Sequence, residues 1–278
     1  MTDRRTWPAN GRVAHESLRG QVEGVVFVPG AARHLTVPVA DLCRAPGGGR
    51  DTQLLWGQGF LVLEDGADGW SFGRAEADGY VGYVETAALG DVSEMTHHVT
   101  ARATHVYSKP DMKSPEGESL PFGARLALSP AGADFWDVAG GGFVPRQHVA
   151  SMDMLAEDAV AVAESLLGAP YLWGGSSAFG IDCSGLVQAA LMASGLACPR
   201  DSDQQEAAFE AVTDAPRRGD LVFWKGHVGM LMDTDTLIHA NAHHMAVAVE
   251  PFAEARARIA AREFGEITKV ARPPATAK

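Results

Sequence analysis

Short apolar runs separated by glycine, aspartate and proline turns fill the first half of the chain, as in small β-barrels. Representative runs are FLVLED, WSFGR, RLALSP and WDVAG, at residues 60–65, 70–74, 125–130 and 136–140. Several positions recur 66 residues later: Leu54, Gly57, Gly66, Ala67, Asp68 and Trp70 return as Leu120, Gly123, Gly132, Ala133, Asp134 and Trp136. This repeat predicts two β-barrels, at 35–92 and 93–152, after an N-terminal arm at 1–34.

The pattern changes near residue 152 to a mixture of helical and strand periodicities. Residues 154–168 carry apolar side chains at helical spacing and end in Gly168, a helix stop signal. A second helix is predicted after Cys183, because apolar positions there share one face. Strands are predicted at 221–226, 227–233, 236–242 and 267–273, and a surface helix at 251–265. We therefore expect an α+β domain at 153–278.

Composition and charge narrow the classes of partner. The 278 residues are 46% hydrophobic and 21% charged, and no apolar stretch approaches the roughly 20 residues of a membrane span. The polar N-terminus has no apolar segment of a signal peptide, so we expect a cytoplasmic protein. The formal net charge of −12 disfavours binding to nucleic acid. We expect neither nucleic acid nor membrane as a partner, and the sequence leaves the oligomeric state open.

The chemistry-bearing candidate is Cys183, where a glycine-rich loop meets the second predicted helix. Unpaired N–H groups and the helix dipole at this position favour a thiolate, the form of cysteine that acts as a nucleophile. Alternatively, Cys183 is a small buried hydrophobic residue, which is how we interpret Cys43 and Cys198. An odd, small number of cysteines does not indicate a disulfide framework.

Two histidines are candidates for the base that a cysteine nucleophile requires. His227 begins one predicted strand and His239 lies in the next, so both imidazoles share a face if the connecting loop has an odd number of residues. His239 would then orient His227 toward Cys183. The alternative is a turn histidine and a satisfied core histidine. His239 and His243 have the spacing of helical metal ligands, but nothing completes a site, so we expect no metal and no cofactor.

Several separate segments together resemble the NlpC-type cell-wall peptidases, a papain-like family of cysteine peptidases. The matching segments, in order, are Tyr171-Leu-Trp-Gly-Gly, Asp182-Cys183-Ser184-Gly185-Leu186-Val187, Gly219-Asp220-Leu221-Val222-Phe223-Trp224, His227-Val228-Gly229-Met230 and Ile238-His239-Ala240. The resemblance covers about residues 155–275. It implies a papain-like catalytic domain in which Cys183 is the nucleophile, His227 the base and His239 the residue that orients it.

The repeated first half resembles tandem bacterial SH3-like domains, and the whole chain is similar to the γ-D-glutamyl-L-diamino-acid endopeptidases of muropeptide recycling. The resemblance implies that Asp201, helped by Tyr80, binds the free amine of an N-terminal L-alanine. It also implies substrate-binding positions at Asp182, Ser184, Ser202 and Trp173. Asp201 could instead be a helix N-cap, since DSDQQ begins like a capping box, and Tyr80 a core aromatic of its barrel.

The expected function is hydrolysis of the D-γ-glutamyl–L-diamino-acid bond in murein tripeptides and tetrapeptides with a free N-terminal L-alanine. One alternative is a papain-like amidase or acyltransferase that acts on another amide. A second alternative, of another class, is a wall-peptide binding protein whose catalytic domain is inert. The choice between diaminopimelate and lysine at the diamino-acid position stays open.

Overall fold

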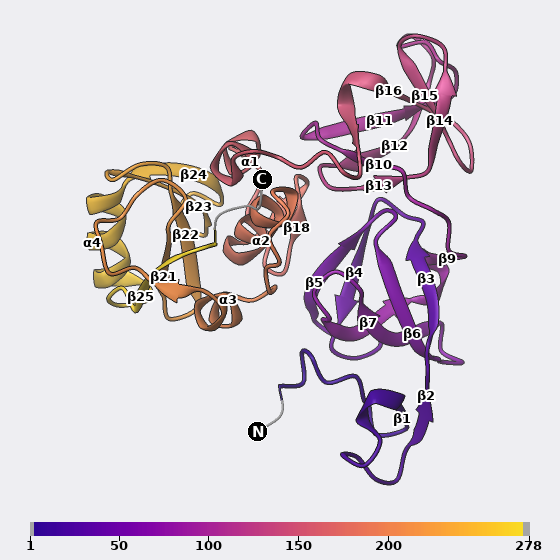
Figure 1. The fold of residues 1–278 in the computed structure, drawn as a ribbon, viewed down its shortest axis with the longest axis horizontal. Helices are drawn as coiled ribbons and strands as arrows, with labels where there is room; N and C mark the ends of the chain where they lie inside the picture. The colour runs from indigo at the N-terminus through magenta and orange to yellow at the C-terminus, as the bar shows by residue number, and fades with distance from the viewer. Residues whose placement is uncertain (1–2, 275–278) are drawn as a thin grey trace. The chain divides into compact units, whose positions relative to one another are not determined.

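The computed structural model describes residues 3–274, which fall into two compact units divided between Met152 and Asp153. The division lies where the sequence pattern changes. None of the helices in the described residues combines the length and the apolar character that a membrane span requires. Each unit is described by itself below (Figure 1).

The first unit begins with an arm in which β1 (Val13–His15) pairs in parallel with β2 (Val26–Val28). An antiparallel sheet follows, in the order β5–β4–β8–β7–β6–β3–β9. Its strands are β3 (Ala31–Leu35), β4 (Val39–Cys43), β5 (Arg50–Leu55), β6 (Gly59–Asp65), β7 (Trp70–Ala75), β8 (Val81–Glu85) and β9 (Leu89–Gly90). Leu35, Leu42, Phe60, Tyr80 and Val84 belong to its buried core.

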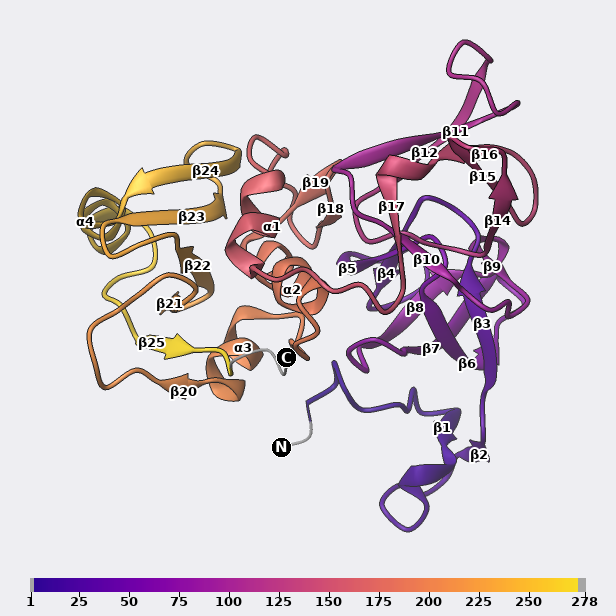
Figure 2. The ribbon, with the colours of Figure 1, turned by 45° about the horizontal axis from the view of Figure 1, so that its top comes forward.

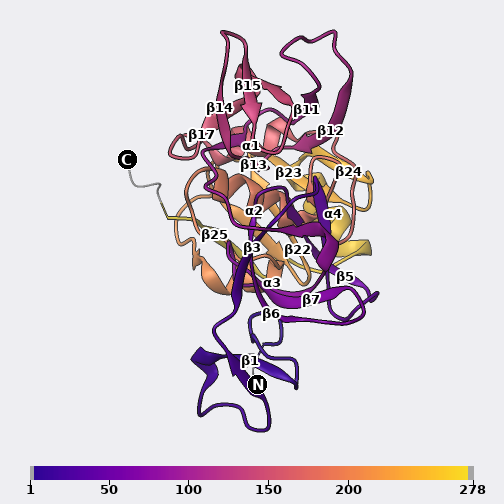
Figure 3. The ribbon, with the colours of Figure 1, turned by 90° about the vertical axis from the view of Figure 1, so that its right-hand side faces the viewer.

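The second barrel of this unit consists of two antiparallel sheets, ordered β12–β11–β16–β15–β14 and β13–β10–β17 (Figure 3). Their strands are β10 (His97–Val99), β11 (Ala103–Tyr107), β12 (Glu116–Pro121), β13 (Arg125–Leu126), β14 (Leu128–Ala131), β15 (Phe135–Val138), β16 (Phe143–Pro145) and β17 (Val149–Ser151). Short 3-10 turns lie at Glu16–Leu18, Thr86–Ala88 and Arg146–His148 in this unit.

Repeated residues occupy equivalent places in the two barrels. Leu54 belongs to the first core and Leu120 to the second. The turn glycines Gly57 and Gly123 both have positive φ, 72° and 83°. Trp136 is covered on one face by the guanidinium of Arg146, whose carbon lies 3.9 Å from the ring centroid. The two barrels contact each other at the turn between β5 and β6, where the Arg125 backbone N–H donates to the Trp56 carbonyl at 2.8 Å.

The second unit contains an antiparallel sheet in the order β20–β25–β21–β22–β23–β24. Its strands are β20 (Glu210–Ala211), β21 (Leu221–Trp224), β22 (His227–Leu231), β23 (Thr236–Asn241), β24 (Ala246–Pro251) and β25 (Lys269–Arg272). The helices are α1 (Ala159–Ser165), α2 (Cys183–Ala193), α3 (Ser202–Ala208) and α4 (Phe252–Arg262), and the short strands β18 (Ser176–Ser177) and β19 (Gly180–Ile181) precede α2. In Figure 2, α4 lies beside β23 and β24. Its Ala255 and Ile259 pack against Leu231 and Leu237.

Barrels followed by a mixed helical and sheet domain confirm the predicted fold class. Some predicted boundaries were wrong. The first helix begins only after its N-cap Asp158, while Met154 and Leu155 are exposed. Asp158 accepts a hydrogen bond from the Val160 N–H at 2.9 Å, and this cap fixes the start that hydrophobic spacing alone placed too early. The last predicted helix, at 251–265, is likewise shorter: it runs from Phe252 to Arg262, between the N-cap Pro251 and the C-cap Glu263.

Candidate active site

Cys183 is the first residue of α2 and is buried, with 7% of its surface exposed. The backbone N–H groups of Ser184 and Val228 lie near its sulfur and lower the pKa of the thiol. The thiol of Cys183 therefore lies beside Val228, the residue that follows His227 in β22.

The two histidines lie in contact on neighbouring strands. His227 Nε2 and His239 Nδ1 are 2.8 Å apart, since the register of β22 with β23 places both side chains on one face. The ring of Phe264 stacks on His227 at a centroid distance of 5.1 Å and an interplanar angle of 11°. Because Nε2 of His227 is engaged with His239, its Nδ1 is the nitrogen left to act as a base.

Burial sets the electrostatics of the pair in the substrate-free protein. Desolvation raises the pKa of the Cys183 thiol to about 12, with Asp182 as a second cause, and it outweighs the lowering by Arg200 and the N–H groups. Desolvation, reinforced by His239, lowers the pKa of His227 to about 3. The N–H of Ser184 at the helix start does lower the cysteine pKa, but the larger effect of burial, which the sequence did not indicate, reverses the net shift. The resting pair is a neutral thiol and a neutral imidazole.

A buried arginine that sequence reasoning missed fixes the loop before Cys183. Arg200 is 1% exposed and donates to both carboxylate oxygens of Asp182 at 2.9 Å, to Ser184 Oγ at 2.9 Å and to the Gly175 carbonyl at 3.0 Å. Asp182 also accepts from the N–H groups of Gly174, at 2.9 Å, and Gly185, at 2.7 Å. Asp182 and Ser184, predicted to bind substrate, are thus engaged within the loop itself.

The remaining predicted substrate-binding residues lie in different surroundings. Trp173, in the loop before α2, is 71% exposed. Asp201 is the N-cap of α3 and forms a capping box with Gln204, and Ser202 is the first residue of that helix. Tyr80 belongs to the core of the first barrel, as its alternative interpretation expected, and its side chain is almost fully buried.

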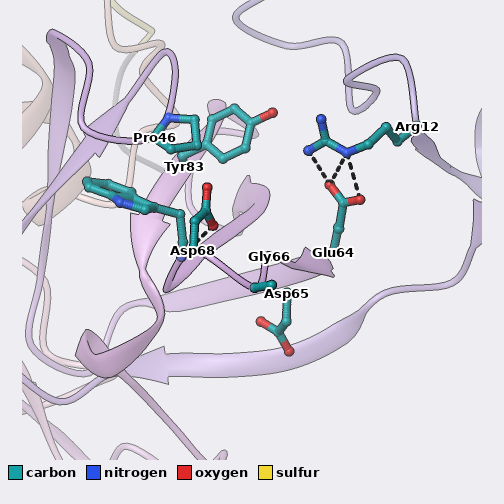
Figure 4. Close-up of a pocket in the computed structure, with 9 residues that line it drawn as sticks. Arg12, Pro46, Glu64, Asp65, Gly66, Asp68 and Tyr83 are labelled. Carbon is teal, nitrogen blue, oxygen red and sulfur yellow. Dashed lines mark hydrogen bonds and ion pairs between the residues drawn. The ribbon is translucent and has the colours of Figure 1, made fainter.

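The first barrel carries a surface pocket of its own. Figure 4 shows it between the β6–β7 turn and β8, with Glu64, Asp68 and Tyr83 among its walls and Arg12 paired to Glu64 at 2.6 Å. Trp70 also lines it, whereas Tyr80 does not. Among the residues 3–274, no three histidine, cysteine, aspartate or glutamate side chains are grouped as metal ligands would be.

Comparison with known proteins agrees with this geometry. Residues 168–259 match the model of the NlpC/P60 family, and they contain the cysteine, both histidines and the strands that carry them. The second unit is an NlpC/P60 domain. Residues 42–89 match the bacterial dipeptidyl-peptidase SH3 domain, so the first barrel is of that type.

Similarity to known proteins extends over both units. The γ-D-glutamyl-L-lysine dipeptidyl-peptidase of Bacillus subtilis is 29% identical over 211 residues, which cover 68% of this chain and 71% of that protein. Dipeptidyl-peptidase 6 of Lysinibacillus sphaericus is 35% identical over 34% of this chain and 36% of its own. A crystal structure of an NlpC/P60 family protein from Bacillus cereus superimposes with a TM-score of 0.73 at 20% identity, covers 87% of this chain and 99% of that one, and shows a shared fold. The protein, whose second unit carries the NlpC/P60 match, is a cysteine peptidase.

Proposed function

We propose that this NlpC/P60 peptidase hydrolyses the D-γ-glutamyl–L-diamino-acid bond of cell-wall peptides that carry a free N-terminal L-alanine. The observation that carries the proposal is the placement of Cys183 at the start of α2, beside Val228 of β22, with the neighbouring His227 in contact with His239. Hydrolysis of cell-wall peptides is further supported by the relatives, which are named dipeptidyl-peptidases and peptidoglycan endopeptidases.

In the proposed reaction, His227 Nδ1 removes the thiol proton as Cys183 Sγ attacks the carbonyl carbon of the γ-glutamyl bond. The pKa values of the resting pair make this a coupled step, because both partners begin neutral. The backbone N–H of Cys183, at the start of α2, is the candidate oxyanion donor. The imidazolium then gives its proton to the leaving amine, and water hydrolyses the thioester.

Selection of a free amine is the second part of the proposal. The carboxylate of Asp201 would bind the L-alanine ammonium, and an acylated amine would leave that carboxylate without its charged partner. An enzyme of this specificity would act on peptides already released from the wall, in keeping with a role in recycling within the cytoplasm. Cell fractionation tests that location. The contact between Tyr80 and the amine stays a prediction, to be tested by Tyr80→Phe.

The test compares L-Ala-γ-D-Glu-L-Lys with its diaminopimelate counterpart and with the N-acetylated forms of both. We expect release of L-Ala-D-Glu from at least one free tripeptide, little from acetylated peptides, and none from Cys183→Ala. Cys43→Ala is the matched control, because it removes another buried thiol from the first unit. Activity that survives in Cys183→Ala would overturn the proposed mechanism.

The role of Asp201 is tested separately with Asp201→Asn. Asparagine caps a helix about as well as aspartate, so α3 keeps its start while the charge is lost. We expect kcat/KM to fall roughly 10- to 100-fold for the free tripeptide, the range of a lost charged hydrogen bond. Equal losses for free and acetylated peptides would show that Asp201 acts only as a cap.

A further inference from the structure

Behind His239 lies a carboxylate that the sequence did not indicate. Glu250 Oε1 is 2.8 Å from His239 Nε2, the ring nitrogen that does not contact His227. The register of β23 with β24 pairs His239 with Ala248 and Leu237 with Glu250, so Glu250 and His239 share a face as diagonal neighbours. The side chain of Glu250 is only 12% exposed. His227, His239 and Glu250 thus form a continuous series of polar contacts across β22, β23 and β24.

This series of contacts determines where the protons lie. An ionised carboxylate only accepts hydrogen bonds, so the nitrogen of His239 that faces Glu250 must carry a proton. His239 is buried and its pKa is lowered, chiefly by desolvation, so the ring is neutral and its Nδ1 is an acceptor. His227 must then donate from Nε2, which leaves its Nδ1 unprotonated. An unprotonated Nδ1 is what the base of a cysteine nucleophile requires.

We propose that Glu250 is a positioning residue that sets the tautomers of His239 and His227 and so presents a basic nitrogen to Cys183. This inference rests on the proposed function, since it assigns His227 as the base. Without the carboxylate, His239 could carry its proton on either nitrogen. His227 would then spend part of its time with the proton on Nδ1 and could not accept another there.

Arg258 keeps Glu250 ionised and in place. Its Nη2 donates to the same oxygen at 2.6 Å, and its other end bonds Glu263. The hydrogen bond from His239 and the charge of Arg258 lower the pKa of Glu250 to about 2. His244, with Nδ1 at 3.6 Å from the same oxygen, also faces the carboxylate. The carboxylate is therefore charged throughout the neutral range.

A merely structural role is the alternative, in which Glu250 ties α4 to the sheet through Arg258. Two variants of the full chain separate the roles. Glu250→Met removes the acceptor and fills a similar volume. Glu263→Gln weakens the other side of Arg258 and touches neither histidine, so it is the matched control.

Kinetics with the free tripeptide provides the first readout. Loss of the residue that sets the tautomer in a serine peptidase triad costs about 10⁴ in kcat, and a residue one step further away should cost less. We expect Glu250→Met to lower kcat on the order of 10- to 100-fold with KM changed less than about threefold. Glu263→Gln should keep wild-type kinetics. Equal losses in both variants would overturn the inference in favour of the structural role.

The second readout does not depend on activity or on a variant that folds. In the substrate-free wild type, nitrogen NMR of ¹⁵N-histidine-labelled protein should show His239 and His227 both protonated at Nε2. A proton on Nδ1 of either residue would overturn the inference, even with a fully active enzyme. Conversely, the expected tautomers together with activity that survives in Cys183→Ala would sink the proposed mechanism alone.

Discussion

Replacement of Arg200 by methionine tests how strongly the loop before Cys183 depends on one buried cation. The guanidinium makes at least four hydrogen bonds, two of them to Asp182, and the methionine side chain would replace none of them. Removal of one partner of a buried ion pair costs about 3–5 kcal/mol, because the other charge stays buried. Asp182 retains the N–H groups of Gly174 and Gly185, which partly compensate its charge. We therefore expect the lower end, about 3 kcal/mol.

Hydrogen exchange of the α2 amides measures this loss within the second unit, without an assumption that both units unfold together. A cost of about 3 kcal/mol corresponds to exchange roughly 150-fold faster, since 1.36 kcal/mol is a factor of ten. The matched control is Arg218→Met, which breaks ion pairs with Asp158 and Glu164 whose side chains are about two-fifths exposed, and it should cost under about 1 kcal/mol. Similar exchange rates in both variants would refute the claim that Arg200 fixes the loop.

Three further predictions concern packing, pH and the ring above the base. Gly57→Ala should destabilise the first unit by roughly 2–4 kcal/mol in thermal unfolding, because φ is +72° and a Cβ would lie 2.2 Å from the Arg125 carbonyl oxygen. The control is Gly47→Ala, where φ is also positive but the space is open, and it should cost about 1 kcal/mol. Burial lowers the pKa of His227 to about 3, so as pH falls the imidazole takes up a proton in the unfolded chain before it does so in the folded protein. The stability contributed by neutral His227 should therefore be fully present above about pH 6.5 and decline toward pH 3 by up to about 1.4 kcal/mol per pH unit. A stability curve equally steep in His227→Gln would contradict this. Phe264→Ala removes the ring stacked on His227 and should lower kcat/KM roughly two- to twelvefold, the equivalent of about 0.5–1.5 kcal/mol, and unchanged kinetics would show that the stack has no role.

The fold could be predicted where its cause is local. Residues that repeat every 66 positions form equivalent cores and turns, because each barrel is specified by its own apolar spacing. The apolar face of α2 is buried as its periodicity indicated. The start of α1 was misplaced because Asp158 caps the helix after two apolar residues that spacing had included.

The site could be predicted only in part, for a similar reason. The contact between His227 and His239 follows from strand parity once the pairing of Leu231 with Leu237 sets the length of the connecting loop, a condition that the sequence analysis left open. Arg200 and Glu250 act through partners that other segments bring to them, and an isolated arginine or glutamate gives no signal of burial. The direction of the cysteine pKa depends on desolvation by the whole domain, which no window of sequence contains.

The duplicated barrels give each repeated position a natural counterpart within one chain. Trp136 is closed off by Arg146, whereas its counterpart Trp70 is a wall of an open pocket among acidic side chains. The same residue type at equivalent positions of the two barrels is thus covered in one barrel and lines a pocket in the other. Parallel substitution at the twin sites would separate what the architecture demands of a tryptophan from what its local neighbours have added.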